Sequence, residues 1–167
     1  ATDLRDNNNV SITHTTGSGC SVTINPGTTT TPNVKLAPSS QTLTQGSQFI
    51  LSVVVENVTD LKGATITLNF DATKLQYSSS DDGDFIPSDT LQENSIDNIN
   101  GNITLDIAGL GESGYHSGMG SGTIMTVTFD TIASGSSNIT LGATDLRDNN
   151  NVSITHTTGS GCSVTIN

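Results

Sequence analysis

The sequence predicts an all-β fold, either a sandwich or a barrel. From Val34 onward, short segments alternate apolar and polar residues, the pattern that places successive side chains on opposite faces of a strand. Clusters of Gly, Asn, Asp and Ser separate these segments at close spacing, as turns between strands require. The helical period of about 3.6 residues is nearly absent.

Five segments carry the clearest alternation, and each is predicted to be a strand with one face in the core. In chain order they are QFILSVVVENV at 48–58, GATITLNFDA at 63–72, NITLDIAG at 102–109, GTIMTVTFDTI at 122–132 and NITLGA at 138–143. In the first, Ile50 and Val54 also make the second face partly apolar, which favours a central or interface-facing strand. The predicted core includes Ile66, Leu68, Phe70, Leu105, Val127 and Phe129.

The two ends of the chain are identical: residues 1–25 and residues 143–167 both read ATDLRDNNNVSITHTTGSGCSVTIN. Within this segment LRDNNNVS is predicted to be a polar turn, and NVSITH and CSVTIN flank the turn TTGSG. We therefore expect a closing β-hairpin, which is too small to be stable unless it docks on a larger sheet. Between the copies, PGTTTTPN at 26–33 is predicted to be a stiff linker, and 34–167 the sandwich domain.

Three hypotheses explain the duplicated ends. Residues 1–25 are the closing segment of a preceding repeat in a tandem array, or a donor segment that pairs with a neighbouring subunit, or a duplication introduced by design. In the first two, copies of the protein join head to tail through an apolar face of residues 1–25. The residues predicted to dock on the other copy are Val10, Ile12, Cys20, Val22 and Ile24.

Charge and composition exclude several classes of partner. The formal net charge is −11, from 5 Lys and Arg against 16 Asp and Glu, so a nucleic-acid partner is excluded. No apolar run is long enough to insert into a membrane. Thr, Ser, Asn and Gly supply most of the polar surface, which is typical of extracellular β proteins. No tryptophan is present, so a stacking platform for carbohydrate is not expected.

The cysteines occupy one position of the repeated segment, because Cys20 and Cys162 correspond. A disulfide framework is therefore not expected. The alternation in GCSVTIN places Cys162, Val164 and Ile166 on one face, which favours a small buried thiol in the core over an intermolecular disulfide.

The order of these segments resembles that of a cohesin-type domain. The resemblance rests on 40–77, which contains the run KGATITLNFDATKL, and on NGNITLDIAG, GSGTIMTVTFDTI and NITLGATDLRDNNN with its closing SVTIN. It implies a jelly-roll β-sandwich of about nine strands on a bacterial or archaeal cell surface. It also implies either a dockerin-binding module or a spacer in a multidomain protein, and it carries no catalytic residues.

Acidic and histidine residues offer few metal ligands. Calcium is the only cofactor with candidates, in two loops whose spacing does not match an EF-hand: Asp81, Asp82 and Asp84 in the first, and Asp145 and Asp148 in the second. The alternative is a solvated loop and ordinary turn chemistry. His14, His116 and His156 lack the spacing of a zinc site.

The remaining motifs favour a structural protein over an enzyme. No nucleophile elbow or other catalytic arrangement is present, so no enzymatic activity is expected. The predicted N-glycosylation sites are Asn9, Asn57, Asn102, Asn138 and Asn151. The sequence therefore predicts an extracellular structural protein, the repeating unit of a filament or tandem array, with a dockerin-binding adhesion module as the alternative.

Overall fold

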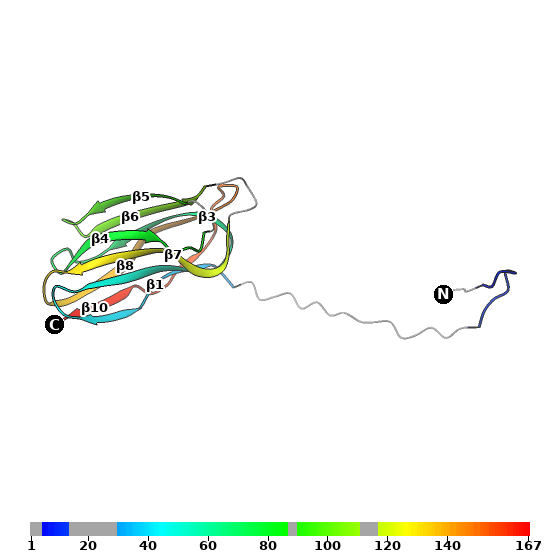
Figure 1. The fold of residues 1–167 in the computed structure, drawn as a ribbon, viewed down its shortest axis with the longest axis horizontal. Coiled ribbons are helices and arrows are strands. Elements are labelled where there is room, and N and C mark those ends of the chain that lie inside the picture. Colours follow the sequence, from blue (N-terminus) through cyan, green and yellow to red (C-terminus); the bar gives the residue numbers. More distant parts are fainter. Residues whose placement is uncertain (1–4, 14–29, 87–89, 111–116) are drawn as a thin grey trace.

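The computed structural model describes residues 5–13, 30–86, 90–110 and 117–167. These residues form ten strands and no helix (Figure 1), so no helix among them could span a membrane. The strands are β1 (Asn33–Ala37), β2 (Ser40–Leu43), β3 (Gln48–Asn69), β4 (Leu75–Asp82), β5 (Thr90–Asp97), β6 (Asn102–Gly109), β7 (Gly118–Thr131), β8 (Gly135–Asp148), β9 (Thr157–Thr158) and β10 (Cys162–Ile166). The predicted all-β class is confirmed.

The long strand β3 belongs to both layers of a sandwich. Its first half pairs with β1 and β7, and its second half pairs with β6 and β8. Between the halves, Asn57 and Asp60 have positive φ angles of 56° and 62°, which Asn and Asp tolerate better than most residues. Phe49 near the start of β3 and Phe70 just after its end both contact Phe129, so the strand folds back on itself.

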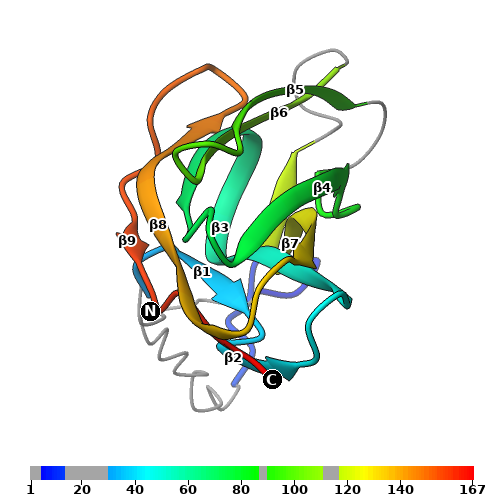
Figure 2. The ribbon, with the colours of Figure 1, turned by 90° about the vertical axis from the view of Figure 1, so that its left-hand side faces the viewer.

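This reversal divides the strands into two sheets, which Figure 2 shows from the end at which the chain leaves the sandwich. The first sheet has the order β9-β1-β3-β7-β4, and the second has the order β5-β6-β3-β8-β10-β2. In the first sheet, β3 lies between β1 and β7, so the central position predicted for residues 48–58 is confirmed.

The core lies between these two sheets and contains the predicted residues. Phe70 is 7% exposed, and the side chains of Ile66, Leu68, Leu105, Val127 and Phe129 are fully buried. Phe129 stacks on Phe49 with ring centroids 5.7 Å apart and meets the edge of Phe70 at 5.1 Å. The alternation of apolar residues was therefore sufficient to predict which side of each strand faces inward.

The closing segment differs from the predicted hairpin. NVSITH and CSVTIN do not pair with each other: β9 pairs in parallel with β1, and β10 lies between β8 and β2. The observed hairpin lies earlier, where Arg147 and Ser153 form a bridge across the Asp148–Val152 turn. Alternation located β10 correctly, but NVSITH forms only the isolated bridge at Ser153, and β9 lies in the predicted turn TTGSG. An isolated segment contains no information about which strand of another layer will pair with it.

The boundary between linker and sandwich also differs from the predicted one. Asn33, assigned to the linker, begins β1 opposite Glu56, and the Pro32 carbonyl accepts a hydrogen bond from the Thr157 N–H at 2.9 Å. The last two residues of PGTTTTPN therefore belong to the sandwich. The linker proper is at most Pro26–Thr31.

Candidate functional site

The repeated segment provides the first candidate site, because its C-terminal copy shows what docking requires. β10 is a central strand between β8 and β2, and Cys162, Val164 and Ile166 are buried as predicted. Burial raises the pKa of the Cys162 thiol, so this thiol is protonated and unreactive at neutral pH. The surface that a second copy of this segment would need is therefore already occupied within the sandwich.

The N-terminal copy can be compared at two of its predicted docking residues. Ile12 is 46% exposed, whereas its equivalent Ile154 is half-buried against the core. Val10 is 59% exposed, and so is its equivalent Val152 in the docked copy. Docking of Val10 stays a prediction, and its equivalent Val152 lies in the turn and faces solvent in the docked copy. Cys20, Val22 and Ile24 lie outside the described residues.

The calcium candidates do not gather into a site. Among the residues that the structure describes, no group of three or more His, Cys, Asp or Glu side chains could hold a metal ion. Asp145 binds the Arg147 Nε at 2.6 Å, and Asp148 accepts the N–H groups of Asn150 and Val152 at 2.8 Å. These two carboxylates support the turn itself. Asp81, Asp82 and Asp84 are all exposed.

The predicted glycosylation sites differ in exposure. Asn9, Asn57, Asn138 and Asn151 are exposed, whereas Asn102 is half-buried and donates through its amide to the Asn69 Oδ1 at 2.8 Å. His156 contacts the Thr144 Oγ1 at 2.8 Å and the Ile154 carbonyl at 2.7 Å, which is a structural role in the closing segment. His14 and His116 lie outside the described residues.

A second candidate site, which the sequence did not reveal, is the outer face of β5, β6, the second half of β3, and β8. We call it the β5-β6-β3-β8 face. Its side chains are short and mostly polar, and they lie in register across the strands: Glu93, Ser95 and Asp97 on β5; Asn102, Thr104, Asp106 and Ala108 on β6; Gly63, Thr65, Thr67 and Asn69 on β3; Thr140, Asp145 and Arg147 on β8. Short side chains make this face flat.

Charge on the β5-β6-β3-β8 face is predominantly negative. It carries the carboxylates of Glu93, Asp97, Asp106 and Asp145 against two cations, Arg147 and, at the end of the face beside Glu93 and Asp106, Lys62. Glu93 and Asp106 stand directly opposite each other on β5 and β6. Two like charges in this arrangement destabilise the pairing of the strands. Asp106 accepts a hydrogen bond from the Thr65 hydroxyl. The face therefore suits a partner that brings positive charge.

A hollow of about 330 Å³ opens at one end of this face. Its lining includes Gly63, Ala108, Glu93, Asp106, Arg147 and Asp148. A Cβ atom on Gly63 would lie 3.3 Å from the Ile107 carbonyl oxygen, so a side chain there would crowd the hollow. Polar residues at alternate positions of 63–69 and 102–108 were visible in the sequence, but pairing of Glu93 with Asp106 required the register.

Comparison with protein families identifies the fold. The family model described as the cohesin domain matches residues 32–166. The chain belongs to the cohesin family. The matched range begins at Pro32, the residue at which the sandwich begins in the structure. A comparison with curated protein sequences returned no match.

Solved structures show the same jelly-roll sandwich. The non-cellulosomal cohesin from the archaeon Archaeoglobus fulgidus aligns with a TM-score of 0.67 at 19% identity, over 83% of this chain and 92% of that one. The sixth cohesin of Acetivibrio cellulolyticus scaffoldin B, solved in complex with a Cel5 dockerin mutant, gives 0.68 at 16% identity, over 83% and 100%. A type II cohesin domain from the cellulosome of Acetivibrio cellulolyticus gives 0.69 at 16%, over 81% and 95%. The predicted jelly-roll fold is confirmed.

Proposed function

We propose that this chain is a non-catalytic scaffold or adhesion module, located outside the cell, that binds a dockerin-like partner through the β5-β6-β3-β8 face. The observation that carries the proposal is the flat face on which Glu93 stands directly opposite Asp106 beside a hollow. Membership of the cohesin family supports it, since several similar structures were solved as complexes with dockerins. A partner that presents Lys or Arg side chains to this face would neutralise the paired carboxylates.

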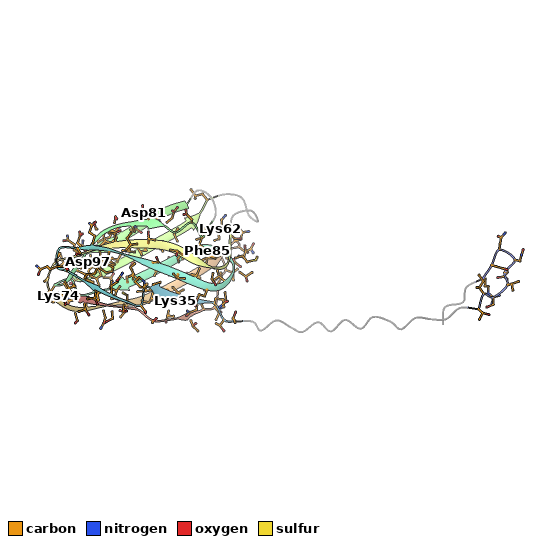
Figure 3. The ribbon with its side chains drawn as sticks, turned by 60° about the horizontal axis from the view of Figure 1, so that its bottom comes forward. Lys35, Lys62, Lys74, Asp81, Phe85 and Asp97 are labelled. Atoms are coloured by element: carbon orange, nitrogen blue, oxygen red, sulfur yellow. The ribbon has the colours of Figure 1, made fainter. Side chains whose placement is uncertain are left out.

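Titration calorimetry of the full chain against a panel of dockerin modules tests this proposal. We expect Glu93→Lys to weaken binding by about tenfold or more. The substitution removes a carboxylate from the face and introduces a positive charge that repels the positive charge of the partner. Asp81→Lys is the matched control: it makes the same charge change at an exposed position on β4 of the other sheet (Figure 3). Equal loss in both variants, or no binding to any dockerin, would contradict the proposed face.

A second function is favoured by the repeated segment: head-to-tail joining of copies into a filament or array. The linker length decides whether residues 1–25 can return to their own sandwich. Asn33 pairs with Glu56, which fixes the position along β3 at which the chain enters the sandwich. Asn167 is hydrogen-bonded to Leu43 and Gln45, which come just before the start of β3 at Gln48. The eight residues of β3 between these positions span about 26 Å.

A linker that returned residues 1–25 to their own sandwich would have to cover that length. Asn25 corresponds to Asn167, and only Pro26–Thr31 separate it from Pro32. Counted to Asn33, the eight steps reach about 25 Å at about 3.1 Å per residue, and the path would also have to pass round to the other sheet, about 10 Å away. This short tether favours docking of residues 1–25 on a different copy over replacement of residues 143–167 in their own copy.

Deletion of residues 1–25, followed by electron microscopy and native mass measurement, tests this second function. If copies join by strand donation, deletion abolishes assembly. If the copies form one covalent array, deletion leaves a folded monomer, and the intact mass of the native material reveals the repeats. The idea fails if the assembled material is found with residues 1–25 packed on their own sandwich.

A further inference from the structure

Two large apolar side chains are exposed at opposite ends of the sandwich, each beside the point where the chain enters or leaves it. We call these the leading end, at Pro32, and the trailing end, at Asn167. Figure 1 shows the chain entering ahead of β1 at one end of the sandwich and the C-terminus at the other. In successive copies, the trailing end of one copy therefore faces the leading end of the next.

At the leading end the exposed side chain is Met119, which is 74% accessible. It lines a hollow of about 440 Å³ together with Thr30 and Pro32, the residues through which the chain enters. Asn57, Val58 and Thr59 of β3 and Gly120 of β7 complete this lining. Methionine is flexible and polarisable, so it adapts readily to an apolar partner surface.

At the trailing end, the exposed apolar side chain beside the point of exit is Ile132, which is 42% accessible. Gln45 ties it to the point of exit: the Gln45 N–H donates to the Asn167 carbonyl at 3.0 Å, and the Gln45 side-chain amide donates to the Ile132 carbonyl at 3.2 Å. Nearby, the Lys74 ammonium donates to the Ser134 carbonyl at 2.7 Å and fixes the β7–β8 turn. Ile132 is thus held beside the chain end.

We propose that Ile132 of one copy packs against Met119 of the next copy, so that successive sandwiches are aligned end to end. The occupant of the Met119 hollow is the trailing end of a second copy of this chain. Linker length carries the argument: the six residues Pro26–Thr31 hold the two ends within about 22 Å of each other. Burial of both side chains removes apolar surface from water.

This inference rests on the second proposed function, and it holds for both forms of that function. In a covalent array Asn25 is the last residue of the earlier copy, as Asn167 is of this one. In strand donation Asn25 takes the place of Asn167 after residues 1–25 displace residues 143–167 of the receiving copy. The same linker then leads to Pro32 of the next copy. The contact is therefore independent of how the copies are joined.

A two-module chain tests the contact directly, because the sandwich has a complete core of its own. Residues 34–167 are followed in this chain by residues 26–167, which preserves the order of module, linker and module. Ile132→Cys in the first module and Met119→Cys in the second are oxidised with copper phenanthroline, and the disulfide is detected by mass spectrometry after cleavage of the linker. Both substituted side chains are exposed, so the fold is retained.

The matched control replaces Ile132→Cys by Ile99→Cys, with Met119→Cys unchanged. Ile99 is exposed at the trailing end too, but it lies in the β5–β6 turn, on the far side of the second sheet from β10. We expect the Ile132–Met119 pair to cross-link at least about ten times faster than the control pair, because a fixed contact raises the effective concentration of the two thiols. Equal rates would overturn the inference.

Failure of the contact and failure of the second function are distinguishable. Equal cross-linking rates together with an intact native mass of many modules would reject the contact alone. Fast, selective cross-linking in the two-module chain, with native material that consists of single unassembled sandwiches, would support the contact and reject the second function.

Discussion

Residues 5–13 and residues 147–155 have the same sequence, RDNNNVSIT, in different surroundings. Both form the same turn: the Asp6 N–H donates to the Val10 carbonyl at 2.9 Å, and the Asp148 N–H donates to the Val152 carbonyl at 3.0 Å. Asn9 and Asn151 have φ angles of 63° and 61°. The sequence of this turn alone therefore specifies its conformation.

Burial, in contrast, depends on the rest of the sandwich. In the second copy the Ile154 N–H donates to the Leu146 carbonyl at 2.8 Å, and Leu146 is fully buried. In the first copy all nine residues are exposed. The turn is a local property and docking is a tertiary one, so paired substitutions at equivalent positions of the two copies separate the two contributions.

Introduction of a charged residue at the centre of β10 should have the largest effect on stability. Val164→Asp buries a carboxylate without a partner and should cost about 4 kcal/mol or more of unfolding free energy, a large part of the stability of a typical domain. Val22→Asp, at the equivalent position of the first copy, should leave urea unfolding of the sandwich unchanged. Equal losses would mean that the two copies exchange places within one chain.

The next largest difference is expected at the leucine before the turn. Leu146→Ala removes a fully buried side chain and should lower the unfolding free energy by about 2–5 kcal/mol. Leu4→Ala, its counterpart, should leave the midpoint of urea unfolding unchanged in unassembled protein. A shift in that midpoint on Leu4→Ala would show that the first copy already docks on a sandwich.

The sequence predicted the local features of the structure better than its tertiary pairings. Alternation predicted the inward faces of β3, β6 and β7, and the Asn-rich turn was predicted at the right place. The pairing of β9 with β1 and of β10 with β2 was not predicted, because both are parallel pairings between segments more than a hundred residues apart.

The candidate site was harder to predict than the core. Buried residues are marked by their own apolarity, but the β5-β6-β3-β8 face consists of common polar residues on strands from separate parts of the sequence. Only the register shows that Glu93 faces Asp106 and that Gly63 leaves room beside them. Val10 was included among the docking residues because the alternation of a strand was extended into a turn, where the equivalent Val152 is exposed.

A smaller effect is expected from the carboxylate that supports the turn itself. Asp148→Ala removes the acceptor for two backbone N–H groups and should lower the unfolding free energy of the sandwich by about 1 kcal/mol. Asp6 makes the same two hydrogen bonds at 2.9 Å, but Asp6→Ala should change only the local turn. Amide hydrogen exchange at Val10 and Val152 checks both variants, and loss of global stability in Asp6→Ala would contradict the division.

The smallest effect concerns pH, at a turn that lies outside both copies. Asp97 at the trailing end (Figure 3) resembles Asp148: it accepts the N–H groups of Ile99 at 3.0 Å and Asn100 at 2.9 Å, and it also accepts the Asn100 side-chain amide at 2.7 Å. These bonds, the side-chain bond first, hold the pKa of Asp97 below its ordinary value. The contribution to stability is therefore present above the pKa of the unfolded chain, about 3.9, and is lost as the pH falls through the lower folded value.

Melting of the wild type and of Asp97→Asn at about pH 7 and about pH 3 tests this expectation. At neutral pH the variant should melt slightly lower, because a neutral amide oxygen is a weaker acceptor than a carboxylate and cannot accept as many bonds. On acidification the variant should lose less stability than the wild type, since the group that binds a proton on unfolding has been removed. Asp6→Asn is the matched control in the undocked copy, and its melting temperature should follow the wild type at both pH values. If Asp97→Asn and the wild type fall in parallel between the two pH values, other carboxylates dominate the acid response, and the turn at Asp97 is held by its backbone alone.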